Sequence, residues 1–281
     1  MIRIATDSTC DLPPGFAERY GIHIVPINIQ FGTDTYEDGV TIDRATFYQK
    51  IEETGSLPST SQPSAGQFRE HYSHLVKQGA DDIISIHVTA KLSGTYQSAE
   101  LAKEMMRDQV RVHPFDSGCG AAGLGFMVLE AARMVEKGKS VAEILARMEV
   151  MRERMNIILT LNDLRFAQMS GRVGKLQSSL ASLLNVKPIV VLEAGIIDVS
   201  EKVRTRRKAI DRMIELMTEA VGTTQPVNLA VVHAEAPDEG QQLLARAESL
   251  FNCRVTFVTD LTTSLVVHFG PKTLGLIAYQ P

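Results

Sequence analysis

The sequence has no long uninterrupted apolar stretch. Its most apolar segment, residues 121–135, contains Glu130 and Arg133 and is shorter than the roughly 20 residues that span a membrane. At the N-terminus the first charge, Arg3, precedes any apolar segment of the kind found in secretory signal peptides. We therefore expect a cytoplasmic protein that does not insert stably into a membrane.

Cysteine is also scarce. The three cysteines, Cys10, Cys119 and Cys253, are widely scattered, and no pair has the spacing of metal ligands. An odd, scattered set is typical of reduced cytosolic thiols rather than of a disulfide framework. The sequence thus predicts neither a metal site nor structural disulfides.

An excess of positive charge is absent as well. With 33 acidic and 29 basic residues the net charge is −4, so the surface as a whole does not attract nucleic acids or anionic lipid headgroups. We expect no nucleic-acid partner. A local basic run does occur at 204–208; it is either a solvated helix face or a contact for a phosphate or an acidic partner.

What the sequence does contain is the composition of an ordinary globular protein, with 44% hydrophobic and 22% charged residues. Its 281 residues correspond to about two domains of roughly 150 residues each. Because no repeat or low-complexity linker separates the halves, we expect the domains to pack closely. A ligand is then expected at their interface.

The first half alternates between strand-like and helix-like segments. Strands are expected at 2–6, 22–29, 83–88 and 110–115, and helices at 64–78, 93–107 and 120–137. Ser64 with Gln67 and Ser140 with Glu143 form capping boxes, which mark helix starts. This alternation predicts an N-terminal α/β domain, residues 1–160, with a parallel sheet covered by helices on both faces.

The second half has a different pattern. Strands are expected at 157–161, 187–192, 195–200, 227–233 and 254–259, and helices at 202–221 and 238–251. The sequence around Ala194 and Gly195 predicts a hairpin turn, which favours local antiparallel pairing. We expect a C-terminal domain, residues 161–281, with a mixed or antiparallel sheet and flanking helices.

Two motifs in the first half are typical of enzymes or nucleotide-binding proteins, but each is incomplete. Asp7 ends the first strand, yet position 9 is Thr, whereas an aspartyl phosphatase has a second acid there. Gly118, Gly120 and Gly123 spell G-x-G-x-x-G, but the segment 137–141 lacks the acidic residue of a dinucleotide site. The glycines fit tight helix-on-sheet packing better.

Other motifs place hydrogen-bond donors at helix starts. Ser93-Gly94 and Thr60-Ser61 each precede an expected helix, where free N–H groups and the helix dipole favour an anion. Alone each is a simple helix cap, but together they offer two sets of donors to one anion. His268 lies in a short helix that ends at Gly270-Pro271, and it is either a structural histidine or a further ligand of that anion.

Taken together, these motifs resemble the DegV family of bacterial proteins, which includes the fatty-acid-binding subunits of fatty acid kinase. The matching stretches are D-S-T-C-D-L-P at 7–13, E-D-G-V at 37–40, T-S-Q-P-S at 60–64, L-S-G-T-Y-Q-S-A at 92–99, F-D-S at 115–117, S-G-R-V-G-K at 170–175, N-V-K-P-I at 185–189, R-T-R-R-K-A at 204–209 and H-F-G-P at 268–271. The chain departs from the family at Lys272, where members usually have glycine.

The resemblance implies a two-domain protein that holds one long-chain fatty acid in a buried tunnel, with no cofactor, no metal and no catalytic residue of its own. It implies that the carboxylate is presented to a separate ATP-dependent fatty acid kinase, whose acyl phosphate enters phospholipid synthesis. The residues matched to carboxylate binding are Thr60, Ser61, Ser93, Gly94, His268 and Arg172, and those for kinase or phosphate contact are Arg204, Arg206 and Arg207. A hydrolase or phosphotransferase using Asp7 or Ser93 with His268 stays open as the alternative.

Overall fold

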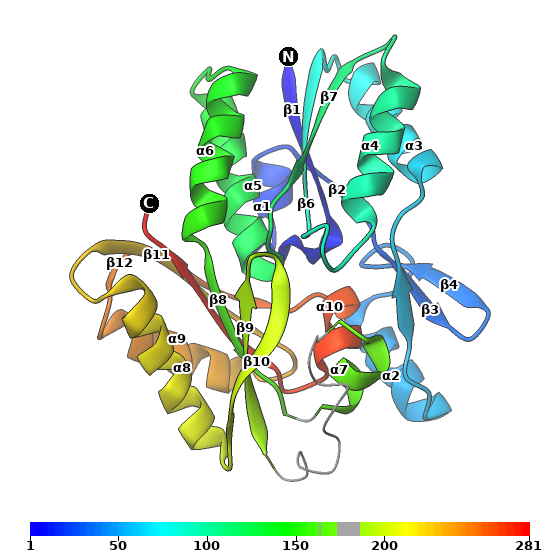
Figure 1. Cartoon of the computed structure of the whole chain (residues 1–281). Coiled ribbons are helices and arrows are strands. Elements are labelled where there is room, and N and C mark those ends of the chain that lie inside the picture. Colours follow the sequence, from blue (N-terminus) through cyan, green and yellow to red (C-terminus); the bar gives the residue numbers. More distant parts are fainter. Residues whose placement is uncertain (163, 173–185) are drawn as a thin grey trace.

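Three β-sheets organise the described residues, 1–162, 164–172 and 186–281, of the computed structural model (Figure 1). The first sheet consists, in order, of the parallel strands β2 (Ile22–Val25), β1 (Ile2–Asp7), β6 (Asp82–His87) and β7 (Arg111–Asp116). In β6 every residue from Ile83 to His87 is buried, which is the pattern of a parallel strand covered on both faces.

Helices cover both faces of this parallel sheet, as the sequence predicts. The helices are α3 (Ala65–Lys77) and α4 (Thr95–Met106) on one face and α5 (Ala121–Glu136), with α6 (Val141–Arg154) packed on it, on the other (Figure 1). A short helix, α1 (Phe16–Arg19), precedes β2. The capping boxes predicted at Ser64 with Gln67 and at Ser140 with Glu143 are confirmed.

The second sheet has six strands and mixed directions. In order it contains β10 (Ile196–Val203), β9 (Lys187–Glu193), β8 (Asn156–Thr160), β13 (Leu274–Tyr279), β11 (Pro226–His233) and β12 (Asn252–Asp260). Only β11 and β12 are parallel neighbours; the other pairs are antiparallel. Helices α8 (Arg206–Val221) and α9 (Pro237–Glu248) pack on one face. The predicted α/β class with a parallel N-terminal sheet and a mixed C-terminal sheet is confirmed.

Local predictions in this half hold at the hairpin and fail at one helix start. β9 and β10 pair as an antiparallel hairpin that turns at Ala194-Gly195. The segment from Lys202 is strand rather than helix, because Lys202 and Val203 pair with β9, and α8 begins only after the cap Thr205. β8 pairs with β9 and β13, and the domain boundary near residue 160 stays a prediction.

A third, small sheet was not expected from the sequence. It consists of the antiparallel strands β4 (Asp34–Glu37), β3 (Asn28–Phe31) and β5 (Ser59–Ser61), and α2 (Arg44–Thr54) lies between β4 and β5 in the chain. Thr60 and Ser61 are therefore strand residues and not part of the entry to α3, which begins at Ala65. This sheet carries them toward the C-terminal half.

One hydrophobic core joins the two large sheets. Every residue of α5 from Ala121 to Leu129 is buried, and α5 contacts strands of both sheets. Gly125 permits this close packing, since a Cβ there would lie 2.3 Å from the carbonyl oxygen of Cys10. No helix in the described ranges is long and apolar enough to cross a membrane.

Candidate functional site

Two adjoining cavities lie where β5, the loop after β6 and α10 (Thr263–Phe269) meet strands of the six-stranded sheet. The first, here the polar cavity, is lined by the polar groups of Thr9, Thr60, Ser61, Gln62, Ser93, Arg172, Ser264 and His268. The second, the apolar cavity, has among its described lining residues no charged side chain. Both share the wall residues Val88, Leu92, Ile197, Leu265 and Phe269. A polar cavity and an apolar cavity thus lie on either side of a shared wall.

The polar cavity gathers five of the six residues predicted for carboxylate binding: Thr60, Ser61, Ser93, His268 and Arg172. The sixth, Gly94, lies behind the wall, because a Cβ there would come within 2.9 Å of Gln62 Nε2. Glycine at this position thus leaves room for the Gln62 side chain. Their roles in binding stay a prediction.

His268 places a buried imidazole at the polar cavity. Its Nε2 lies 2.9 Å from the hydroxyl of Thr60, and its buried Nδ1 has no hydrogen-bond partner among the described residues. Burial, and then the positive charge of Arg172, lower the pKa of His268 to about 4. The imidazole is therefore neutral at pH 7. In the tautomer in which Thr60 donates to Nε2, Nδ1 carries the proton and is an uncommitted donor.

Ser93 lies just before α4, which begins at Thr95, two residues later than the start at residue 93 that the sequence predicts. Its hydroxyl accepts a hydrogen bond from the N–H of Thr95 at 3.3 Å and lies 2.8 Å from the Thr95 hydroxyl. Gly94 is the N-cap and adds no side-chain bond. Free N–H groups at the start of this 12-residue helix therefore favour an anion at the polar cavity.

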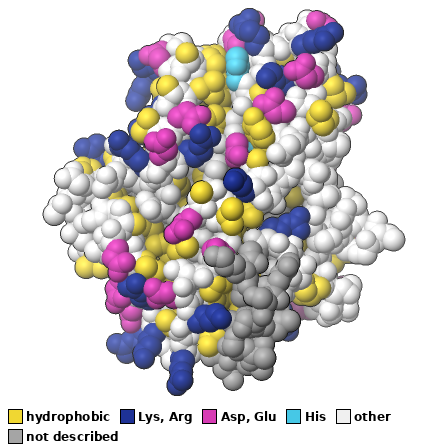
Figure 2. Space-filling model, in the orientation of Figure 1, with side chains coloured by type: hydrophobic (Ala, Val, Ile, Leu, Met, Phe, Trp, Pro, Cys, Tyr) yellow, Lys and Arg dark blue, Asp and Glu magenta, His cyan; other side chains and the backbone are white. Residues whose placement is uncertain are grey.

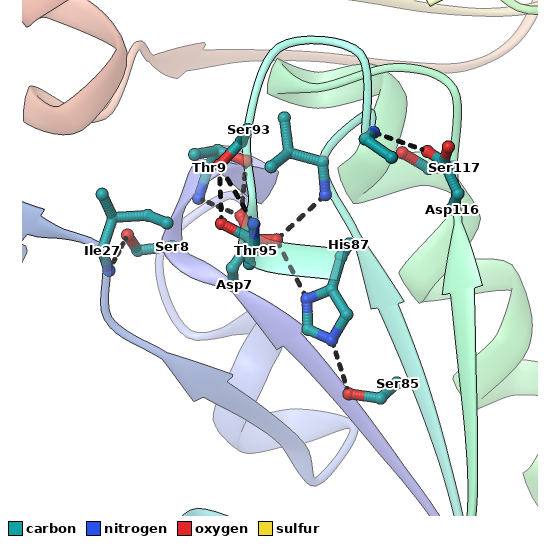
Figure 3. A network of polar contacts seen from close by, with 12 residues as sticks. Asp7, Ser8, Thr9, Ile27, Ser85, His87, Ser93, Thr95, Asp116 and Ser117 are labelled. Carbon is teal, nitrogen blue, oxygen red and sulfur yellow. Dashed lines mark hydrogen bonds and ion pairs between the residues drawn. The ribbon is translucent and has the colours of Figure 1, made fainter. Parts of the chain in front are cut away.

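Asp7 belongs to a buried network beneath the polar cavity and does not face a ligand (Figure 3). Its carboxylate accepts hydrogen bonds from Thr9 N, Thr9 Oγ1 and Val88 N, at 3.1, 2.5 and 3.0 Å, and contacts His87 Nδ1 at 3.1 Å. Both carboxylate oxygens are thus committed. Asp7 orders two loops that line the cavity, and the geometry gives it no reacting partner.

The network continues away from the cavity through residues that the sequence analysis missed. His87 Nε2 lies 2.7 Å from Ser85 Oγ, which accepts a hydrogen bond from Tyr72 OH at 2.8 Å. All three are fully buried. Ser85 and His87 are two residues apart on β6 and so face the same side of the sheet. That spacing was the one feature of the sequence that could have indicated their hydrogen bond.

Two buried aspartates hold the start of α10, which carries His268. Asp11, in the loop after the short 3-10 helix η1 (Ser8–Cys10), accepts a hydrogen bond from Thr262 N at 2.8 Å. Asp38 accepts hydrogen bonds from Ser8 Oγ and Thr262 Oγ1, at 2.8 and 2.5 Å, and from Thr263 Oγ1. The N-terminal half therefore positions this wall of the polar cavity.

The basic run lies apart from both cavities. Arg206 forms an ion pair with Glu239 at 2.7 Å, whereas Arg204 and Arg207 are exposed and have no ion pair within the described part of the chain. Figure 2 shows acidic and basic side chains intermixed over the face that it draws. Of the three arginines predicted to contact a kinase or a phosphate, two are therefore uncommitted. Residues 173–175 and Asn185 of the quoted motifs lie outside the described residues.

Lys272 takes the conformation that glycine would favour. Its φ is +60°, its N–H donates to the Ala234 carbonyl at 2.7 Å, and its ammonium donates to the carbonyl of Glu235. It lines neither cavity. Lys272 therefore contacts the backbone of Ala234 and Glu235 and does not form part of either cavity wall.

Two glycines of the G-x-G-x-x-G motif lie in close packing contacts. A Cβ at Gly123 would lie 2.8 Å from Ile157 Cδ1, and one at Gly120 would lie 3.3 Å from Val88 Cγ2. These glycines therefore serve close packing of α5 against neighbouring strands. Across residues 1–162, 164–172 and 186–281, no group of three or more His, Cys, Asp or Glu residues is arranged to hold a metal ion.

Comparisons with known proteins agree with this architecture. The model of the DegV family matches residues 1–280. A DegV domain-containing protein of Halalkalibacterium halodurans is 35% identical over 278 residues, 99% of this chain and 98% of that protein. The crystal structure of DegV, a fatty acid binding protein from Bacillus subtilis, matches with a TM-score of 0.90 at 32% identity, covering 100% of this chain and 99% of that chain. A stearic acid-binding protein from Eubacterium ventriosum matches with a TM-score of 0.92 at 25% identity, covering 100% and 98%. The chain belongs to the DegV family.

Proposed function

We propose that this protein binds one long-chain fatty acid, with the carboxylate in the polar cavity and the acyl chain in the apolar cavity. The observation that carries the proposal is the uncommitted, buried Nδ1 of His268 at a polar cavity that shares a wall with an apolar cavity. A buried carboxylate needs several donors, and here hydroxyls, an imidazole and a helix start supply them. The fatty acids bound by the related structures support the same ligand class.

The acyl chain would supply most of the affinity. About 15 buried methylenes at ~0.8 kcal/mol each give a gross ~12 kcal/mol, before the costs of association and ordering. The carboxylate adds charge-assisted hydrogen bonds, which are among the stronger ones. Binding at nanomolar level or tighter is thus feasible, and mass spectrometry of an organic extract from the freshly purified, denatured protein should find stoichiometric long-chain fatty acid.

A double variant tests the carboxylate site. Ser93→Ala with His268→Ala removes two donors to a charged group, each worth about 1.5–3 kcal/mol, so fatty-acid affinity measured by titration calorimetry should fall at least about 100-fold. Ser249→Ala with His74→Ala changes the same residue types at exposed positions and should leave affinity unchanged. Unchanged affinity in the first pair would remove Ser93 and His268 from the site.

We further propose that the protein is a non-catalytic cytoplasmic carrier, which presents the carboxylate to a separate ATP-dependent kinase. The exposed Arg204 and Arg207 are the candidate contacts for that kinase. Arg204→Glu with Arg207→Glu should impair acyl-phosphate formation without weakening fatty-acid binding. Persistence of coupling would make this run a solvated face. Turnover of model esters or phosphate esters that is lost in Ser93→Ala would instead support the hydrolase or phosphotransferase alternative.

A further inference from the structure

The part of the apolar cavity wall that contains Thr89 lies against the β9–β10 hairpin turn, because the Thr89 hydroxyl contacts Gly195. There the apolar cavity shares Thr89, Cys119 and Leu192 with a third cavity, here called the charged cleft. The charged cleft is also lined by Lys91, Asp116, Arg152, Glu153 and Glu193. The apolar cavity thus adjoins the charged cleft at these shared residues.

A tight contact between the two halves of the chain lies at this boundary. The hydroxyl of Thr89, a buried residue of the loop after β6, donates a hydrogen bond to the carbonyl of Gly195 at 3.0 Å. Figure 1 shows the hairpin turn reaching from the six-stranded sheet toward the lower end of the parallel sheet. Thr89 is itself fixed, because its N–H donates to the Cys119 carbonyl at 2.8 Å.

The turn is built for close approach. Ala194 and Gly195 both have left-handed backbones, with φ of +48° and +80°. A Cβ at Gly195 would lie 2.5 Å from Thr89 Oγ1 and 3.2 Å from Lys91 Cγ. Glycine is therefore required both by the backbone conformation and by the space.

We infer that the Thr89–Gly195 contact is the end-stop of the acyl cavity and limits the length of the fatty acid that binds. This inference rests on the proposed function. An acyl chain that fills the apolar cavity ends at this contact, and further methylenes must either break it or enter the charged cleft. Each buried methylene raises affinity roughly fourfold, and a methylene that stays exposed adds nothing. Affinity should therefore rise with chain length and then stop rising.

The experiment measures affinity by titration calorimetry for saturated fatty acids of increasing length, about C12 to C22, in the full-length protein. Thr89→Val removes the hydroxyl and keeps the side-chain shape, and Gly195→Ala forces the turn away from Thr89. Both variants should move the length of best binding upward by two or more carbons. Thr89→Ser retains the hydroxyl and should retain the wild-type limit.

A matched control separates the contact from backbone strain. Gly32→Ala introduces Ala at a left-handed position (φ +59°) in the β3–β4 turn, where an added Cβ meets nothing within 4 Å. It should leave the length profile unchanged. If Gly195→Ala does not fold, Thr89→Val and Thr89→Ser decide the matter.

The outcomes distinguish the two proposals. A wild-type protein that binds fatty acids, with the same length profile in Thr89→Val as in wild type, overturns the end-stop and leaves the proposed function intact. A wild-type protein that binds no fatty acid of any length overturns the proposed function, and the end-stop with it. A shifted limit in Thr89→Val, absent from Thr89→Ser and Gly32→Ala, establishes the end-stop.

Discussion

Replacing Asp38 by alanine tests how the N-terminal half positions the polar cavity. The Asp38 side chain is buried and accepts hydrogen bonds from Ser8, Thr262 and Thr263. These donors come from η1 and from the start of α10, whose residues Leu265, His268 and Phe269 line the cavities. Asp38→Ala therefore releases one wall of the proposed ligand site.

The expected loss in the free energy of unfolding follows from the hydrogen bonds that Asp38→Ala removes and from two effects that partly compensate for them. Each hydrogen bond to a charged group contributes about 1.5–3 kcal/mol. Water from the adjoining open cavity, which Asp38 also lines, can replace part of this. Burial, and secondarily the nearby Asp38, raise the pKa of Asp11 well above its usual range, so removing Asp38 also relieves repulsion. We expect a net loss of about 2–4 kcal/mol in the free energy of unfolding.

The assay is urea denaturation, followed by fatty-acid titration at a concentration where the variant is folded. Because α10 carries His268, loosening this wall of the polar cavity should lower fatty-acid affinity about tenfold. That loss corresponds to one interaction of about 1.4 kcal/mol. Asp108→Ala is the matched control, since Asp108 is 89% exposed and should change stability by less than about 0.5 kcal/mol. A loss below about 0.5 kcal/mol in Asp38→Ala would refute the reasoning.

Two further predictions concern pH and Lys272. Burial, and then the neighbouring His71 and His74, lower the pKa of His23 to about 4. The neutral imidazole therefore contributes up to about 3 kcal/mol to the free energy of unfolding above pH 6.5, and this contribution is lost as the pH falls toward 4. Urea denaturation should show that the free energy of unfolding of His23→Gln falls less steeply than that of wild type between pH 6.5 and 4, and equal slopes would contradict the assignment. Lys272→Gly removes the strain of a left-handed backbone at an exposed residue. Thermal unfolding should therefore show that the free energy of unfolding rises by up to about 1 kcal/mol, with fatty-acid affinity unchanged. A weaker affinity would place Lys272 in the site.

Local sequence signals predicted the parts of the fold that local interactions determine. The capping box at Ser64 and the hairpin turn at Ala194-Gly195 were readable because their own residues make the stabilising contacts. β5 was not readable, since Ser59–Ser61 is a short polar segment that becomes a strand only by pairing with β3. β13 was likewise missed, although it pairs with both β8 and β11 at the centre of its sheet.

The site shows the same division. Thr60 and His268 are 208 positions apart, and no spacing rule in a single sequence brings them together; the family resemblance did so. Asp38 belongs to the E-D-G-V stretch at 37–40, but the sequence alone assigns it no role, because its partners Thr262 and Thr263 are brought to it only by the packing of α10. Non-local convergence of polar groups is therefore what the sequence could not supply.

Three buried aspartates share one property, which separates two classes of substitution. Asp7, Asp38 and Asp11 touch no proposed ligand, yet each is buried and fixes backbone or hydroxyl groups that border the polar cavity. An unpaired buried polar group is costly, so these bonds hold the loops and α10 in one arrangement. Substitutions there should lower stability and fatty-acid affinity together. Substitutions at Ser93 or His268 remove donors to the ligand as well as the contacts with Thr95 and Thr60, so the loss of affinity should exceed what the loss of stability accounts for.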